Sequence, residues 1–550
     1  AAPGWESLLK MSSTPLPDGS RTCPWYDPDR LPFFNGSPPQ SVYQMFLRGH
    51  TKNPTGHCIG YRQLQPDASQ RGDYVYKTYQ ETKLLCEQVG HALRSLSINK
   101  GDKVGIYSRN NPSWMLTSYG AASQGIVTVP IYDSLGSDAA EYVINHAELS
   151  AVFVEEKNLD NLIKLQQKCP TLKHIVVMSM FEIDAAATES NAHITSNNAI
   201  SFNTFLSLSS NANHPPEPIT PDDLFVIMYT SGTTGAPKGV MLKHKAFIDS
   251  VGSAEIFFQR HGFTFTSQDS IMSYLPLAHI FAQQCDAFMY SVGGSVSFSQ
   301  GDPKLINDDL MACKPTVFPG VPRVFARFEE KIQQSIGKSN PVVQLLFNFA
   351  LWRQSINVES LQNPSDFWNA LILSKVKAQI LPNVRLVING SAPLSPKTND
   401  FLKAIFNCPV VQGFGCTETV GGLLCSGLRS KSGSVGGPLP GVYAKLVDVP
   451  EMGYVSSACP PQGELWLKAG CITHGYYRNE EATRDALIDG WLATGDIAQW
   501  NDDTDFGSLT IIDRKKNLFK LSHGEYVSPE RLELEYAKCG LVSQIWVYGN

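Results

Sequence analysis

The residues best suited to chemistry lie in one short stretch, Tyr229 to Val240, which reads YTSGTTGAPKGV. The stretch follows an apolar run, Leu224 to Met228, that is typical of a buried parallel strand. Glycine lets the backbone approach a ligand closely, and successive N–H groups in such a loop form a nest for anions. Hydroxyl side chains and Lys238 add neutral donors and a positive charge. The stretch therefore predicts a polyphosphate-binding loop, with a flexible surface loop as the alternative.

The order of these residues excludes one common phosphate loop. A Walker loop reads GxxxxGK followed by Ser or Thr. Here Lys238 follows Pro237 and precedes Gly239, so the pattern fails. A P-loop NTPase is therefore disfavoured.

Four later stretches again combine glycine with polar or charged side chains. Each alone has an ordinary interpretation, because Thr-Glu-Thr is common at a helix N-cap, Thr-Gly-Asp in a turn, and a short basic run on a solvated surface. Their order along the chain carries more information than any one of them. They are GSAPLS at Gly390–Ser395, QGFGCTET at Gln412–Thr419, TGD at Thr494–Asp496 and IIDRKKNLFKLSHGEYVSPE at Ile511–Glu530.

Together with the first loop, these stretches resemble the ordered motifs of the adenylate-forming superfamily, which includes acyl-CoA synthetases, beetle luciferases and peptide-synthetase adenylation domains. Three further stretches resemble the long-chain fatty acyl-CoA synthetases in particular. They are LPLAHIFAQ at 275–283, KPTVFPGVPRVFARF at 314–328 and DGWLATGDIAQW at 489–500. The resemblance extends from about residue 75 to the end of the chain.

This resemblance implies a two-step reaction. A long-chain fatty carboxylate attacks the α-phosphorus of ATP to give an acyl-adenylate and pyrophosphate, and the thiol of CoA then takes the acyl group and releases AMP. Mg²⁺ is implied as the metal, because hard cations prefer oxygen ligands and bridge phosphates. The first step brings an anion to a polyanion, so charge neutralisation and positioning are the main catalytic tasks.

The resemblance also implies roles for individual residues. Those expected to bind the nucleotide are Ser231, Gly232, Thr233, Thr234, Gly235, Lys238, Gly390, Ser391, Ala392, Gln412, Gly413, Phe414, Thr417, Asp496 and Arg514. Those expected to take part in catalysis are Lys238, Glu418, Lys516 and Lys520, with Thr233 and Glu418 as metal ligands. Those expected to meet the fatty acid are His279, Gly320 and Val321, although a satisfied core histidine is the alternative for His279. Lys516 matches a hinge, and Lys520 and Gly524 match residues that face the thioester site after a domain rotation.

The chain departs from the family pattern at three places. Phe414 stands where tyrosine is usual, so stacking on the base is kept while a hydroxyl contact is lost. No tryptophan occurs directly after His279, where the chain reads Ile280, Phe281 and Ala282, so the tryptophan gate of some bacterial relatives is not expected. Lys468 and Ala469 replace a common Arg–Gly pair, and no role is assigned to them.

Two other function classes stay open on the sequence. One is an adenylating enzyme with an acceptor other than CoA. The other is a non-catalytic protein that binds nucleotide or lipid. Product analysis with and without CoA separates the first from a CoA ligase.

Composition narrows the class of protein. The chain has 550 residues and a net charge of −6, from 45 basic and 51 acidic side chains, which gives no electrostatic case for nucleic acid. Its 12 cysteines form no CxxC pair, which argues against a zinc site and against a small disulfide scaffold. Reduced thiols in a reducing compartment are expected.

Alternating strand and helix patterns predict an α/β fold with parallel or mixed sheets covered by helices. We expect an irregular N-terminal arm at 1–70, a large core at 71–435, a small β-rich subdomain at 436–512 and the beginning of a mobile α+β C-terminal domain at 513–550. A polar stretch between Ser179 and Pro221 predicts an insertion or partial disorder. The first residue is Ala1 and the chain ends in the strand-like IWVYGN, so we expect a C-terminally truncated chain whose natural N-terminus is also missing.

The apolar strip VVQLLFNFALW at 342–352 has two interpretations. A helix packed into the core is favoured over a surface that meets a membrane, which would need an exposed apolar face. Peripheral membrane association, oligomeric state and chain-length preference are therefore left open. The expected location is intracellular, on the cytoplasmic side of the endoplasmic reticulum or at the peroxisome.

Overall fold

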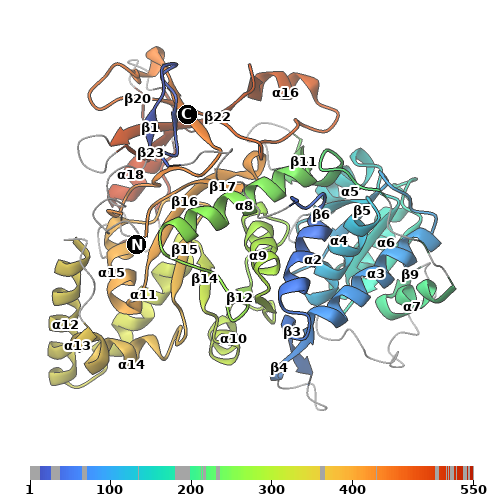
Figure 1. Ribbon diagram of the computed structural model, residues 1–550, viewed down its shortest axis with the longest axis horizontal. Coiled ribbons are helices and arrows are strands. Elements are labelled where there is room, and N and C mark those ends of the chain that lie inside the picture. The colour runs from blue at the N-terminus through green and yellow to red at the C-terminus, as the bar shows by residue number, and fades with distance from the viewer. Residues whose placement is uncertain are drawn as a thin grey trace.

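The computed structural model describes residues 13–25, 37–64, 71–133, 136–179, 199–211, 214, 218–230, 236–359, 366–428, 430–501, 507–515, 517, 519–520, 526–527, 529–536, 542 and 545–548. Side chains of a few residues within these ranges, among them Leu64, Glu359 and Lys520, are not described. The expected α/β class is confirmed, with four larger sheets and helices packed on and between them (Figure 1).

One sheet is almost entirely parallel and carries the first glycine-rich loop at its edge. Its strand order is β11-β10-β6-β5-β7-β8-β9, and only the β10–β11 pair is antiparallel. Both faces are buried, because neighbouring side chains along the strands enter two separate apolar clusters. The strands are β5 (Lys103–Tyr107), β6 (Val127–Ile131), β7 (Ala151–Glu155), β8 (His174–Met178), β9 (Ala199–Ser201), β10 (Leu224–Thr230) and β11 (Lys238–Lys243).

The helices beside this sheet begin at clear local signals. In α3 (Tyr79–Ser95), Thr78 and Glu81 form a reciprocal capping box. In α4 (Pro112–Ser123), the side chain of Asn111 accepts a hydrogen bond from the amide of Trp114 and proline occupies the first turn. Helices α5 (Ser137–His146) and α6 (Glu156–Gln166) follow on the same part of the chain.

A second, mixed sheet carries the next motifs at its strand ends. Strands β14 (Val317–Gly320), β15 (Leu386–Asn389) and β16 (Val410–Cys416) are parallel, and β17 (Gly421–Cys425) and β18 (Gly437–Pro438) follow antiparallel. A third sheet has the order β12-β13-β3-β4, from β12 (Ser270–Ser273), β13 (Ser295–Phe298), β3 (His57–Leu64) and β4 (Arg71–Thr78).

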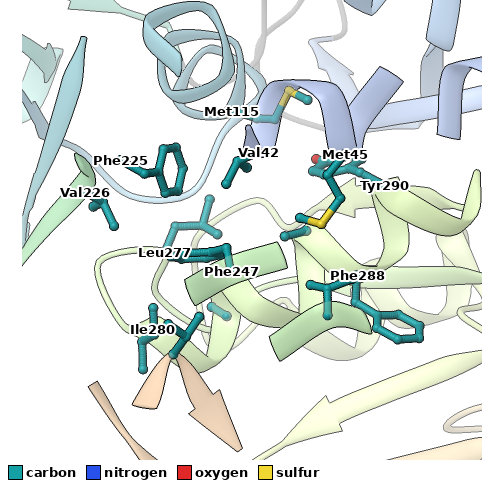
Figure 2. Packing of buried hydrophobic residues seen from close by; sticks show 14 of the residues in the cluster. Val42, Met45, Met115, Phe225, Val226, Phe247, Leu277, Ile280, Phe288 and Tyr290 are labelled. Atoms are coloured by element: carbon teal, nitrogen blue, oxygen red, sulfur yellow. The ribbon is translucent and has the colours of Figure 1, made fainter. Parts of the chain in front are cut away.

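Helices α8 (His244–Arg260) and α9 (Ile280–Val292) lie centrally and contact more than one sheet. Figure 2 shows the apolar cluster around them, in which Val42 and Met45 lie near Phe247, Leu277 and Tyr290. Val42 and Met45 belong to α2 (Val42–Lys52), whose N-cap Ser41 accepts from the amide of Gln44. The expected irregular arm is therefore wrong for α2 and β3, because a capped apolar stripe and a paired strand bury this part of the chain.

A fourth sheet, which we call the β-rich unit, lies in the region where the sequence predicted a small β-rich subdomain. Its strand path is β1-β2-β19-β20-β22-β21, with β23 also paired to β22, so two strands from the start of the chain extend it. The strands are β1 (Thr14–Pro15), β2 (Arg21–Thr22), β19 (Tyr443–Val447), β20 (Gln462–Lys468), β21 (Leu487–Ile488), β22 (Trp491–Asn501) and β23 (Ser508–Arg514). Beyond it the described elements are β24 (Phe519–Lys520), β25 (Tyr526–Val527) and α18 (Pro529–Tyr536).

A layer of helices covers the mixed sheet on the side away from the parallel sheet (Figure 1). It comprises α11 (Pro322–Gly337), α12 (Pro341–Glu359), α13 (Asp366–Trp368), the π-helical turn η4 (Asn369–Leu373), α14 (Ser374–Lys377) and α15 (Pro396–Phe406). The favoured interpretation of α12 as a core helix is wrong for most of its surface, since Leu345 is 71% exposed and Trp352 is 54% exposed. No helix in the described part of the chain is both long and apolar enough to span a bilayer.

Candidate active site

A single cavity of about 900 Å³ brings several of the predicted residues together. It opens between the mixed sheet, helices α8 and α9, and the β-rich unit, whose strands β22 and β23 contribute to its wall. Predicted residues that line it are Lys238, His279, Gly390, Ser391, Gly413, Thr417, Glu418 and Arg514. The remaining wall divides into a polar part and an apolar part.

The edge of the parallel sheet supplies the first polar side chain. Strands β10 and β11 pair in antiparallel register, with Thr230 opposite Lys238, and these two residues flank the glycine-rich stretch along the chain. Lys238 lies at the first position of β11, and its Nζ lies 5.3 Å from the centre of the Tyr476 ring. The loop residues Ser231, Gly232, Thr233, Thr234 and Gly235 lie outside the described residues.

Glu418 lies in a single turn of 3₁₀ helix, Thr417–Thr419, between β16 and β17. The hydroxyl of Thr419 accepts from the amide of Cys416 and donates to the carbonyl of Gly421, which fixes the turn from inside. Glu418 is held from outside as well. Its carboxylate accepts from the Tyr476 hydroxyl at 2.7 Å, and its carbonyl accepts from the amide of Thr473 at 2.7 Å.

Tyr476 is a site residue that the sequence reasoning missed. It lies eight residues after Lys468, in a segment to which no role was assigned from the sequence. An isolated bridge joins it to Val240, and the amide of Tyr477 donates to the carbonyl of Gly239 at 2.7 Å. The same short segment therefore fixes both the strand that carries Lys238 and the turn that carries Glu418.

The ends of β15 and β16 form another wall. Gly390 lies so close to the ring of Phe281 that a Cβ there would come within 2.9 Å of it, and Ser391 adopts a positive φ of 69°. A left-handed non-glycine residue beside a cavity is a feature of ligand sites, because surrounding contacts must hold the strain. Gly413 and Thr417 line the same region.

Gln412 does not line the cavity, although it was predicted to bind nucleotide. Its side chain is buried behind the wall, where Oε1 accepts from the amide of Leu394 at 2.8 Å and Nε2 donates to the carbonyl of Ser434 at 3.2 Å. Asn389 also donates to Gln412 and to the carbonyl of Ala392. The side-chain amides of Asn389 and Gln412 thus hold the Gly390–Leu394 segment from its buried side. Ala392 and Phe414 likewise do not line the cavity, and neither do Gly320 and Val321, whose neighbours Val317 and Pro319 do.

The β-rich unit contributes Glu464, Arg514 and Lys515 to the polar part of the cavity, whereas Asp496 is buried directly behind Arg514 and does not line the cavity. Asp496 lies at a register pair with Arg514, and the two side chains form an ion pair of 3.2 Å. Thr494 fixes the turn, because its hydroxyl donates to the carbonyl of Leu465 and accepts from the amide of Asp496. Glu464, which the sequence did not single out, accepts from the amide of Gly495 and from Lys515, each at 3.2 Å.

The predicted hinge follows this group directly. Lys515 donates its amide to the carbonyl of Gly495 at 2.8 Å, which ties the last residue before the hinge to the TGD turn. Lys516 and Gly524 lie outside the described residues, and of Lys520 only the backbone, in β24, is described.

His279 lies between the polar and apolar parts. It is the N-cap of α9, and its Nδ1 accepts from the amide of Phe281 at 3.3 Å. An amide can only donate, so the neutral ring carries its proton on Nε2. Burial lowers the pKa of His279, which keeps it neutral at pH 7. The ring therefore has one donor left to offer to the cavity that it lines.

The apolar part of the cavity is lined with aromatic and thiol side chains. The ring centres of Phe265 and Phe288 lie 4.6 Å apart, and those of Phe258 and Phe265 lie 5.3 Å apart. Burial raises the pKa of the Cys425 thiol to about 12, so it behaves as an apolar neighbour rather than as a nucleophile. Other apolar lining residues are Ala254, Ile271, Cys285, Met289, Val317, Leu424 and Leu439.

The donor set suits a hard cation that is shared with phosphates. Within the described residues no group of three or more His, Cys, Asp or Glu side chains is placed to hold a metal. Three carboxylates line the cavity, Glu418, Glu464 and Asp485, and of these Glu418 shares the contact of Tyr476 with Lys238. Mg²⁺ accepts one or two protein carboxylates when a polyphosphate supplies further oxygens. The residues present therefore fit Mg²⁺ only together with a nucleotide.

The fold is that of adenylate-forming enzymes. It resembles the adenylation domain of a carboxylate reductase from Mycobacterium chelonae, with a TM-score of 0.75 and 22% identity over 96% of this chain and 79% of that one. At this identity the likeness concerns the fold alone.

Sequence comparison narrows the class. The model of the AMP-binding enzyme family matches residues 61–477. Long chain acyl-CoA synthetase 2 of Arabidopsis thaliana is 40% identical over 93% of this chain and 76% of its own length. The peroxisomal long chain acyl-CoA synthetase 7 of the same plant is 39% identical over 87% of this chain and 67% of its own length. The chain belongs to the AMP-binding enzyme family and, within it, to the long-chain acyl-CoA synthetases.

Proposed function

We propose that this protein is a fatty acid–CoA ligase that forms AMP. A fatty carboxylate oxygen attacks the α-phosphorus of ATP, and the bond to pyrophosphate breaks. The sulfur of CoA then attacks the acyl carbonyl, the bond to AMP breaks, and the thiol proton passes to solvent. Adenylation is needed because a free carboxylate offers only oxide as a leaving group.

The observation that carries the proposal is the composition of the one cavity. Its polar part presents Lys238, Glu418 and Arg514, which suit a nucleoside triphosphate. Its apolar part is lined by Phe258, Phe265 and other apolar side chains, which suit an acyl chain. Most ligand sites are apolar with a few placed polar groups, and here the polar groups are gathered at one end. A ligand that joins a nucleotide to a fatty chain fits such a division.

Each polar residue has a proposed task. Lys238 neutralises phosphate charge, and Asp496 accepts hydrogen bonds from the ribose while Arg514 holds that carboxylate in place. Glu418 is the metal ligand among the described residues, with Thr233 as the second that the family resemblance suggests. When Mg²⁺ is bound it would neutralise and orient the phosphate oxygens. His279 is placed to donate its Nε2 proton to the fatty carboxylate or acyl oxygen.

Other roles rest on the family resemblance. Ser231, Gly232, Thr234 and Gly235 are proposed to hold the β- and γ-phosphates. Lys516 is proposed as the hinge of a rotation between the half-reactions, and Lys520 as a residue that then faces the thioester site. For location we propose an intracellular site at a membrane or in the peroxisome, since one relative is peroxisomal.

Two measurements test the proposal. Calorimetric titration with a palmitoyl-adenylate mimic, in which a sulfamate replaces the phosphate, should give one tight site, and AMP and decanoyl sulfamate alone should bind far more weakly. Turnover with acids of graded chain length should need ATP and CoA together and yield AMP. Adenylate formation with no thioester would favour an acceptor other than CoA, and no binding of the mimic would refute the proposal.

A further inference from the structure

An exposed apolar surface lies on the helical layer that covers the mixed sheet, far from the parallel sheet (Figure 1). We name it the α12 surface. It gathers eight of the fifteen large apolar side chains that are exposed in the described part of the chain. They are Val342, Val343, Leu345, Leu346, Phe349, Trp352, Phe367 and Leu371. Scattered apolar residues are normal on a protein surface, but a contiguous patch of this kind marks an interaction site.

The helix shows why the patch exists. One narrow stripe of α12, with Phe347, Ala350 and Gln354, is buried against the protein. That stripe packs on α15 and η4, which is enough to hold the helix in place. Six of the exposed side chains on the other faces are large and apolar, with Asn348 and Arg353 exposed among them, so this helix of nineteen residues presents hydrocarbon to solvent on more than one face.

The aromatic members are tied to each other. The ring centres of Phe349 and Trp352 lie 5.5 Å apart, and those of Phe349 and Trp368 lie 5.1 Å apart. The ring centres of Phe367 and Trp368 also lie 5.1 Å apart, so the aromatic group joins α12 to α13. Indole and phenyl rings at a helix surface are typical of elements that lie in the interface of a bilayer, where one part is apolar and another is wet.

The charged residues near the α12 surface favour a lipid bilayer over a protein partner. From Lys338 to Lys377 the sequence contains four basic residues, Lys338, Arg353, Lys375 and Lys377, and two acidic residues, Glu359 and Asp366. The side chain of Arg353 is exposed beside the Trp352 ring. Exposed Lys338 precedes the helix and exposed Lys375 follows η4. Glu329 and Glu330 lie on α11, about two turns before its end. The segment that carries the α12 surface thus has a net positive charge, which complements anionic lipid headgroups, whereas the whole chain has a net charge of −6.

We infer that the α12 surface docks the protein on an anionic lipid bilayer, with α12 lying in the plane of the interface. A helix in this orientation buries its apolar face about 5–10 Å into the boundary between headgroups and acyl chains. The inference adds a lipid bilayer as a partner to the proposed function. Docking would let the enzyme take a fatty acid from the membrane in which it dissolves, and only this purpose rests on the proposed function. Docking itself needs no turnover.

Vesicle flotation of the purified chain tests the inference. Vesicles of equal parts phosphatidylcholine and phosphatidylserine should carry the protein to the top of the gradient, and pure phosphatidylcholine or high salt should reduce the bound fraction several-fold. The double variant Leu345→Glu/Trp352→Glu should lose at least about tenfold in vesicle affinity, since two apolar anchors become charges. Both side chains are exposed, so the fold should be kept.

A matched control uses exposed apolar residues elsewhere. Leu84 is 49% exposed on α3 and Leu305 is 41% exposed, and Leu84→Glu/Leu305→Glu should bind vesicles like the parent chain. Equal loss in both double variants, or no loss in the first, would overturn the inference. Light scattering tests the alternative that a second copy of the chain covers the α12 surface. If the parent chain is a dimer that does not bind vesicles, and Leu345→Glu/Trp352→Glu dissociates it, a second copy covers the surface. These outcomes are distinct from failure of the proposed function, which the adenylate mimic measures.

Discussion

The phenol of Tyr476 donates a hydrogen bond to the carboxylate of Glu418 at 2.7 Å, although 58 residues separate the two along the chain. The same ring lies 5.3 Å from the ammonium of Lys238. One side chain thus contacts the proposed metal ligand and the proposed phosphate ligand. A ligand carboxylate that is oriented by a second side chain loses less freedom when it binds a cation.

Tyr476→Phe should therefore weaken binding of magnesium ATP by about tenfold to a hundredfold, since outer partners of metal ligands have effects of that size. The ring that faces Lys238 is kept, so packing should not change. Calorimetric titration of ATP at several Mg²⁺ concentrations measures the effect. Tyr477→Phe is the control, because the structure gives no contact between that hydroxyl and Glu418. A loss that is the same with and without Mg²⁺ would show that Tyr476 acts on the nucleotide alone.

Glu418→Gln should abolish most metal-dependent adenylation while it leaves the fold intact. The amide keeps the size of the side chain and can still contact Tyr476, but it removes the negative charge that attracts the cation. We expect a loss of several kcal/mol in transition-state stabilisation, of the order found when a metal ligand is removed. Pyrophosphate release reports it, with Glu451→Gln, an exposed residue far along the chain, as the control. Near-normal release would remove Glu418 from the metal site.

Phe265→Ala should shift the acyl preference towards longer chains. Phe265 makes edge-to-face contacts with Phe258 and Phe288 in the apolar wall, so its removal extends the space available to hydrocarbon. Each extra methylene that gains contact is worth about 1–3 kcal/mol in discrimination. Competition between C16 and C20 adenylate mimics measures the ratio. Phe263→Ala, whose ring does not line the cavity, should leave that ratio unchanged even if it lowers stability.

Asp286 predicts a pH dependence of stability. Burial raises its pKa from 3.8 to about 7, with the Ser273 hydroxyl as a partner and the rings of Tyr119 and Tyr290 among its neighbours. Because the folded pKa is above the unfolded one, the protein gains stability from the protonated form at low pH. This contribution is lost as the pH rises from about 4 to about 7.

Asp286→Asn mimics the protonated group and should remove that slope. Its melting temperature should come closest to that of the parent near pH 4 and exceed it by a growing margin up to pH 8, with an upper limit of about 4 kcal/mol from the two pKa values at 1.36 kcal/mol per unit. Scanning fluorimetry across this pH range measures the difference. A parent and variant that stay parallel from pH 5 to 8 would mean that Asp286 is ionised in the folded protein throughout.

Much of the fold follows from local patterns. The apolar runs at Val104, Val129, Val152 and Val176 are continuous rather than alternating, which is the signature of strands buried on both faces, and all four lie in the parallel sheet. The motif order placed Lys238, Gly390, Glu418 and Arg514 in one site, because strand ends of neighbouring sheets converge there.

Other features depend on tertiary structure that the sequence does not encode locally. The contact between Tyr476 and Glu418 joins distant segments, and no spacing rule connects them. Gln412 was assigned to the nucleotide because it belongs to the motif QGFGCTET, yet a side chain within a strand can face either side of the sheet, and here it faces inward. The strip at 342–352 is interrupted only by Gln344 and Asn348, so periodicity could not say which face is buried.

The strand pair β1–β2 has a consequence for how the protein is made. Arg21 and Thr22 pair with Ala444 and Tyr443 of β19, and the hydroxyl of Thr22 donates to the carbonyl of Val442, 420 residues later. Ser13 likewise donates to the carbonyl of Gly507. At about 5–20 residues per second, β2 leaves the ribosome about 20–80 s before β19. Strand β2 must therefore wait for β19 while about 420 residues are made, and the β-rich sheet is completed only after β23 has emerged.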